Sequence, residues 1–203
     1  MRDWWLRTLL VLQRPRPVFA ALRDDSREAV ADRAEPILLI VLLAGIAAIL
    51  VTPTAAHLND DGSFDPLVIA VWAFVVGSLN GLFAYFALGA VLYGGVKALG
   101  SQGSYRRSRH VLAFACVPIA LSLAVWPVKL VLYGGDWFHT GGGDTGAGGA
   151  VFDLVELAFF LWSVVLLVVG VRAVHAWTWA RAGAACALAI AAPLAIAVAL
   201  RTI

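Results

Sequence analysis

Three charged residues lie near the ends of apolar runs, where ionised side chains are unusual: Lys129, Asp153 and Glu156. Lys129 ends one predicted membrane span, and the two acids begin the next. Because consecutive spans run in opposite directions, we expect all three at similar depth near the outer membrane surface. An ionised group at the edge of the hydrocarbon is unfavourable unless it is paired. The residues therefore predict either a Lys129–Glu156 ion pair that locks two helices together, or the floor of an outward-facing polar cavity.

Other residue types that carry chemistry do not fall into a recognisable motif. The four histidines are far apart, and no His-Glu-x-x-His sequence occurs. The chain has no Gly-x-Ser-x-Gly or Walker sequence, and its glycine-rich loop lacks the Gly-Lys pair of a phosphate cradle. Cys116 and Cys186 lie in apolar runs, where thiols behave as small apolar groups. We therefore predict no catalytic, cofactor-binding or metal-ligating residue, no nucleic-acid partner and no enzymatic activity.

The composition places these residues in membrane-spanning helices. Hydrophobic residues make up 62% of the 203 and charged residues 14%, whereas soluble domains average roughly 25% charged residues. A hydrocarbon core of about 30 Å needs about 20 apolar residues per helix. The sequence predicts an all-α integral membrane protein with five transmembrane helices, spanning residues 37–53, 67–96, 111–132, 151–174 and 182–200. Residues 36–203 form the membrane domain, and residues 1–35 precede it as a cytoplasmic helix and linker.

The distribution of cations predicts the orientation of the spans. Thirteen of the fifteen Lys and Arg residues fall in three segments, namely residues 1–35, 97–110 and 172–181. The loops at residues 54–66 and 133–150 contain none. Since cytoplasmic segments are enriched in Lys and Arg, we predict a cytoplasmic N-terminus and an outside C-terminus.

The first residues predict a helix that lies in the membrane interface. On a helix, Arg7 shares a face with other charged residues, while Trp5 lies on an apolar face, and Trp4 is its neighbour. Tryptophan at headgroup level and arginine reaching water are typical of such helices. A soluble amphipathic helix docked on the bundle is the alternative. Trp177 and Trp179, in the predicted cytoplasmic turn, are expected at the same interface.

Small residues predict where the helices pack. Gly77 and Gly81 form a Gly-x-x-x-Gly pattern beside Asn80, which we interpret mainly as an interhelical hydrogen-bonding residue. In the last span, small residues recur at every fourth position and include Ala187, Ala191 and Ala195. Such patterns let helix backbones approach closely in lipid. Pro118 in the third span removes a backbone hydrogen bond and predicts a kink at a packing position.

Three stretches together resemble a known family. Residues 103–118 contain a Gly-rich polar turn followed by an apolar cluster that ends in Pro118 inside the third span. This stretch resembles the signature of the Yip family, multi-pass membrane proteins first known as interactors of Rab GTPases. Residues 16–22 look like the proline–aromatic motif of its prokaryotic members, and residues 162–179 look like the fourth span and turn. The resemblance implies five spans, a cytoplasmic N-terminus and a bacterial or archaeal plasma membrane.

The resemblance also bears on partners. Eukaryotic members carry a longer acidic, aromatic cytoplasmic tail before the spans, and this sequence departs from that pattern. The departure argues against direct GTPase binding. For the prokaryotic branch the resemblance implies a fold and a location in the membrane, without an established biochemical activity.

The sequence favours a non-enzymatic function. We predict a membrane-organising or adaptor protein that acts through helix packing and through contacts with the lipid bilayer, a second copy of itself or other membrane proteins. The alternative is a transporter or channel component for a small solute, ion or lipid. Asn80, the kinked third span and the group Lys129, Asp153 and Glu156 motivate this alternative.

Overall fold

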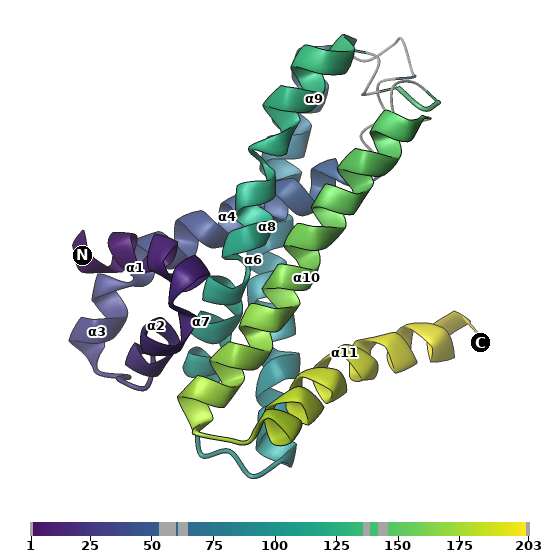
Figure 1. Ribbon diagram of the computed structural model, residues 1–203. Coiled ribbons are helices and arrows are strands. Elements are labelled where there is room, and N and C mark those ends of the chain that lie inside the picture. The colour runs from purple at the N-terminus through teal and green to yellow at the C-terminus, as the bar shows by residue number, and fades with distance from the viewer. Residues whose placement is uncertain (1, 53–59, 61–64, 136–138, 142–145, 202–203) are drawn as a thin grey trace. The chain divides into compact units, whose positions relative to one another are not determined.

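The computed structural model describes residues 2–52, 60, 65–135, 139–141 and 146–201, and within them the chain is all helical, without a β-strand. The helices are labelled in Figure 1. In chain order they are α1 (Arg2–Gln13), α2 (Pro15–Ala21), α3 (Arg27–Asp32), α4 (Ala34–Leu50), α6 (Pro66–Ala98), α7 (Tyr105–Ala115), α8 (Val117–Ser122), α9 (Val125–Tyr133), α10 (Ala147–His175) and α11 (Trp179–Arg201). The predicted all-α class is confirmed.

Three helical segments are long and apolar enough to cross a membrane. They are residues Leu67–Ala98, Tyr105–Tyr133 and Ala147–His175, found among the residues that the structure describes. They coincide with the predicted second, third and fourth spans, although each extends a few residues further. The predicted first span corresponds to α4, which has 17 residues, and the predicted fifth span lies within α11.

The third of the predicted spans is interrupted near each of its two prolines. Helix α7 ends at Ala115 and α8 begins at Val117, with Pro118 in its first turn. Helix α9 begins at Val125, so Pro127 also falls in a first turn. Proline has no N–H to donate, and the first turn of a helix is where a missing donor leaves no bond unmade. The chain therefore continues through this region as three short helices.

The contacts of the chain define two compact units. Unit 1 comprises Met1–Leu38, Ala84–Ala115 and Val164–Ile203, and unit 2 comprises Leu39–Phe83 and Cys116–Ser163. Helices α1, α2, α3, α7 and α11 belong to unit 1, and α8 and α9 belong to unit 2. Helices α4, α6 and α10 contribute residues to both.

Within unit 2, α4 and α6 contact each other directly through backbone. A Cβ built on Gly45 of α4 would overlap the carbonyl of Gly77 and the backbone of Gly81. A Cβ built on Gly77 would lie 2.6 Å from the Cα atom of Ile46. The structure thus places both glycines of the predicted packing pattern against α4, where Gly45 completes the contact. Asn80, next to them on α6, is half-buried.

We expect Gly45→Ala to lower the free energy of unfolding by about 2 kcal/mol, because the added methyl group forces two backbones apart. Thermal unfolding of the purified protein in detergent measures the effect. Gly94→Ala in α6 is the matched control, since no described atom lies within 4 Å of a Cβ at that position. The control should be neutral, or stabilising by up to about 1 kcal/mol because alanine favours a helix over glycine. Equal stability of the two variants would contradict the close contact.

Candidate functional site

The first part of the candidate site is an ion pair between α9 and α10 in unit 2. Lys129 Nζ donates to Glu156 Oε1, and the two side chains are only 3% and 11% exposed. The ammonium also lies 4.4 Å from the centre of the Trp126 ring and 5.5 Å from that of Phe152. An opposite charge and two aromatic faces thus offset the loss of hydration of the ammonium. The ion-pair alternative of the sequence prediction is therefore realised in the structure.

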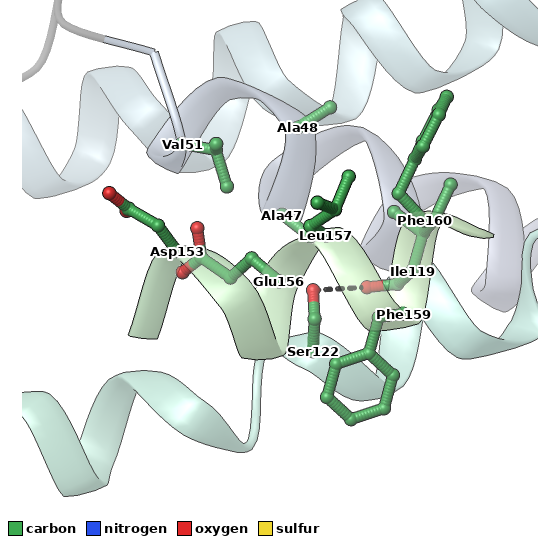
Figure 2. Close-up of a pocket in the computed structure, with 10 residues that line it drawn as sticks. All are labelled: Ala47, Ala48, Val51, Ile119, Ser122, Asp153, Glu156, Leu157, Phe159 and Phe160. Carbon is green, nitrogen blue, oxygen red and sulfur yellow. Dashed lines mark hydrogen bonds between the residues drawn. The ribbon is translucent and has the colours of Figure 1, made fainter. Parts of the chain in front are cut away.

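The second part is a cavity of about 510 Å³ beside this pair. Figure 2 shows the carboxylates of Asp153 and Glu156 close together, the ring of Phe160 further along α10, and the ring of Phe159 on another side of that helix. Ser122 also lines the cavity, and its hydroxyl donates to the carbonyl of Ile119 at 2.7 Å. The remaining lining residues are apolar, namely Ala47, Ala48, Val51, Ile119 and Leu157. The predicted ion pair and a cavity with acidic groups therefore occur side by side, and Glu156 belongs to both.

The other predicted packing residues differ in how deeply they are buried. Pro118 is buried at the start of α8. Ala187 and Ala191 are exposed on α11, whereas the buried residues of that helix include Ala182, Ala185 and Cys186. The face of α11 that contacts the rest of unit 1 is therefore not the predicted small-residue ladder. Ala195 lies outside the residues whose side chains the structure describes.

The two neighbouring tryptophans of α1 point to different surroundings. The side chain of Trp4 is 6% exposed and packs on Phe114, with ring centres 5.6 Å apart. The guanidinium of Arg7 lies 4.7 Å from the centre of the Trp4 ring. Trp5 is 39% exposed. Trp4 therefore packs inside unit 1, contrary to its predicted place at the membrane interface, and Trp5 is the exposed one of the two.

The tryptophans after α10 lie among arginines. The Arg181 guanidinium lies 4.3 Å from the centre of the Trp177 ring, and that of Arg172 lies 4.4 Å from the centre of the Trp179 ring. Trp177 is partly exposed and Trp179 is exposed. Exposed tryptophan beside arginine is the combination found at membrane–water interfaces.

Sequence reasoning missed a buried arginine in unit 1. Arg33 has no exposed surface, and its Nε donates to His110 Nδ1 at 2.9 Å. Its Nη1 donates to the carbonyl of Asp24 at 2.8 Å, and its Nη2 lies 3.4 Å from Asp25 Oδ1. Burial lowers the pKa of Arg33, while the charges of Asp25 and Asp24 act in the opposite direction. Since arginine stays protonated in proteins, this is a buried charge held by three polar partners.

The same cluster ties the N-terminal segment to the polar turn before α7. Ser104 Oγ donates to Asp25 Oδ2 at 2.6 Å, and Arg107 Nη2 donates to the carbonyl of Arg23 at 2.7 Å. Arg23 Nε in turn donates to the carbonyls of Ala173 and Val174 at 3.1 Å, at the end of α10. Cations at a helix C-terminus satisfy carbonyls that have no partner within the helix. Nothing in the linear spacing distinguished Arg33 or Asp25 from the solvated charges around them.

Three stretches that are far apart in the sequence meet in unit 1. A Cβ built on Gly170 of α10 would lie 2.8 Å from Phe19 of α2 and 2.9 Å from Val111 of α7. A Cβ built on Gly103 would lie 2.9 Å from the His175 ring, whose Nδ1 is 3.2 Å from Ser101 Oγ. These contacts join the proline–aromatic motif, the polar turn and the end of α10. Parts of all three stretches that carry the family resemblance therefore meet in unit 1, whereas Pro118 belongs to unit 2.

Comparison with protein families tests the resemblance. The sequence model of the Yip1 domain matches residues 9–200, which is nearly the whole chain. The chain belongs to the Yip family. Comparison with curated proteins and with solved structures found no match. Membership and the three membrane-length helices together identify this Yip-family chain as an integral membrane protein.

The residues that the Yip1 model matches include two separate polar clusters, one in each unit. The buried Arg33 cluster is built from the polar turn and the N-terminal segment, both within the matched residues. The pair Lys129–Glu156 and the adjoining cavity also lie within them. Each polar cluster links helices, and the cavity in addition offers a space that a ligand could enter.

Proposed function

We propose that this Yip-family protein is a non-enzymatic, membrane-organising or adaptor protein with five spans. Helices α4 and α11 supply the first and fifth spans. At 1.5 Å per residue, 17 residues reach about 25 Å and 23 residues about 35 Å, close to the thickness of the hydrocarbon core. The Gly45 contact supports α4 as a span, because direct backbone packing is typical of helices in lipid.

The proposed orientation has the N-terminus in the cytoplasm and the C-terminus outside. Of the fifteen Lys and Arg residues, fourteen fall in the sequence of unit 1 and one, Lys129, in that of unit 2. Unit 2 contains seven of the thirteen acids. The positive-inside rule therefore favours a cytoplasmic location for the membrane-flanking parts of unit 1. A bacterial or archaeal plasma membrane is the setting we propose.

The observation that carries the proposed function is the outward face of α1. Trp4 and Val11 are buried in unit 1, whereas Trp5, Leu6, Leu9 and Leu10 are exposed. A helix that is anchored on one side and apolar on the other inserts its free side into the headgroup region. Because insertion into one leaflet displaces lipid, such a helix favours a curved membrane. We propose that this is how the protein shapes the bilayer.

The proposal that the protein acts without catalysis rests on how its polar groups are used. The Lys129–Glu156 pair links α9 to α10, and the Arg33–His110 contact links the start of α4 to α7. Each group is occupied in holding helices together. We propose lipid as the principal partner, and we do not propose direct GTPase binding.

The test replaces the outward leucines and leaves the anchoring residues in place. We expect Leu6→Ser/Leu9→Ser/Leu10→Ser to weaken insertion by on the order of 1 kcal/mol per leucine, because apolar area is lost from the lipid-facing side. The measurement is the diameter of proteoliposomes by electron cryomicroscopy. The triple variant should return the vesicles toward the size of protein-free ones.

The matched control is Leu6→Met/Leu9→Met/Leu10→Met, which keeps the apolar face and should reshape vesicles as the natural sequence does. Thermal unfolding checks that both variants keep the fold. If the serine variant folds and reshapes vesicles as well as the methionine variant, α1 is not the element that acts on the membrane.

A further inference from the structure

The cavity in unit 2 has the size of a small-molecule site, and its lining has a polar part and an apolar part. Its volume of about 510 Å³ falls within the range of roughly 300–1,000 Å³ typical of ligand pockets. Most of the wall is apolar, while Asp153, Glu156 and Ser122 supply polar atoms. Figure 2 shows the two carboxylates toward one end and the ring of Phe160 toward the other. An occupant should therefore have one polar group and one apolar body.

The charge at the polar end is negative. Glu156 is neutralised by Lys129, which is the one cation in the sequence of unit 2. Asp153 is exposed at the surface of the chain, and no Lys, Arg or His among the described residues forms an ion pair with it. One carboxylate charge is thus left at the cavity, so an anion would be repelled and a cation attracted. An ionised residue in a spanning helix of a membrane protein is a candidate for ligand binding.

The surroundings favour an organic cation over a metal ion. No group of three or more His, Cys, Asp or Glu side chains is close enough to hold a metal within the described part of the chain. Calcium, for comparison, takes six to eight oxygen ligands. An ammonium group needs a single carboxylate, and the organic substituents on its nitrogen need an apolar wall. Phe159 and Phe160 line this cavity.

We propose that this cavity binds an ammonium group attached to an apolar body, with the ammonium at Asp153 and the apolar part against Leu157 and Phe160. Such a group occurs in a free organic cation and in the headgroup of an aminolipid. The site does not depend on the action of α1 on the membrane, so it goes beyond the function proposed above.

The experiment measures binding of tritiated benzyltrimethylammonium to the full-length protein by equilibrium dialysis. A maltoside detergent is used because it carries no ammonium group. We expect saturable binding at one site per chain. Neopentylbenzene, the neutral carbon analogue of the probe, should compete poorly. Absence of saturable binding, or equal competition by the neutral analogue, would overturn the proposal.

Variants locate the site. Asp153→Asn should weaken binding about fivefold, the contribution expected of one exposed charge pair. Asp65→Asn is the matched control: it removes the same charge from unit 2, and asparagine can still accept the hydrogen bond that the Leu67 amide makes to Asp65 at 2.7 Å. Ala48→Phe should abolish binding by filling the cavity from an exposed position on α4. If Asp153→Asn and Asp65→Asn have equal effects, or if Ala48→Phe binds normally, the site is not this cavity.

Added phosphatidylethanolamine separates the two sources of the ammonium group. A weaker apparent affinity for the probe in its presence means that the lipid headgroup occupies the site. An unchanged affinity identifies a free organic cation as the occupant. Phosphatidylglycerol, which lacks an amine, is the control lipid and should not compete.

Discussion

Lys129→Met is expected to lower the free energy of unfolding by about 3 kcal/mol, because it leaves the buried carboxylate of Glu156 without its counter-charge. The side chain of Glu156 is only 11% exposed, so water replaces the lost ammonium incompletely. The cation–π contacts with Trp126 and Phe152 are lost at the same time. Thermal and denaturant unfolding in detergent measure the change.

The double variant Lys129→Met/Glu156→Met distinguishes a lost pair from a lost packing residue. Two apolar side chains of similar volume need no compensation, so the double variant should regain most of the stability. Lys97→Met is the control for removing a lysine. Lys97 is exposed and lies 5.6 Å from the centre of the Tyr93 ring, so its loss should change the stability by about 1 kcal/mol or less. A double variant as unstable as Lys129→Met would show that the pair is not the source of the effect.

Arg33→Met is the second change with a large expected effect. It should lower the free energy of unfolding by about 3 kcal/mol, since it removes a buried guanidinium from three partners. His110 loses its donor, and Asp25 loses a buried counter-charge. Hydrogen exchange should increase in residues 24–33 and 104–110, the segments that this cluster joins.

Arg33→Lys should rescue little of this loss, because one ammonium cannot reproduce the geometry of a planar guanidinium. Arg27→Met is the matched control. Arg27 is exposed in the first turn of α3, and its replacement should change the stability by about 0.5 kcal/mol or less. If Arg27→Met and Arg33→Met are equally mild, the buried contacts of Arg33 do not stabilise unit 1.

These predictions concern residues that the sequence revealed to different degrees. Lys129 and Glu156 were predicted as a pair because each is an isolated charge at the edge of an apolar run, and an unpaired charge there is unfavourable. Arg33 was counted only among the cations of residues 1–35. Its partners are His110, 77 positions away, and the nearby Asp24 and Asp25. A contact over that distance leaves no periodic pattern in the chain.

The packing of the small residues was likewise predicted only in part. Gly77 and Gly81 were recognised as a packing face, but the identity of the facing helix was not, since Gly45 stands alone in an apolar run. In α11 the regular ladder of small residues suggested one face, whereas Ala182 and Ala185 form the contact within the chain. Spacing reports which residues share a face and not which face is occupied.

The all-helical class, the membrane setting, a bend in the third span and the family could be predicted from the sequence alone. Each of these depends on hydrophobicity summed over many residues, or on proline chemistry that acts locally. The tertiary structure decided that Trp4 is buried while Trp5 is exposed, that Arg33 is enclosed, and that a cavity adjoins the Lys129–Glu156 pair. These features depend on which side chains from distant segments fill the same space. Packing in three dimensions sets that outcome, and composition and periodicity do not encode it directly.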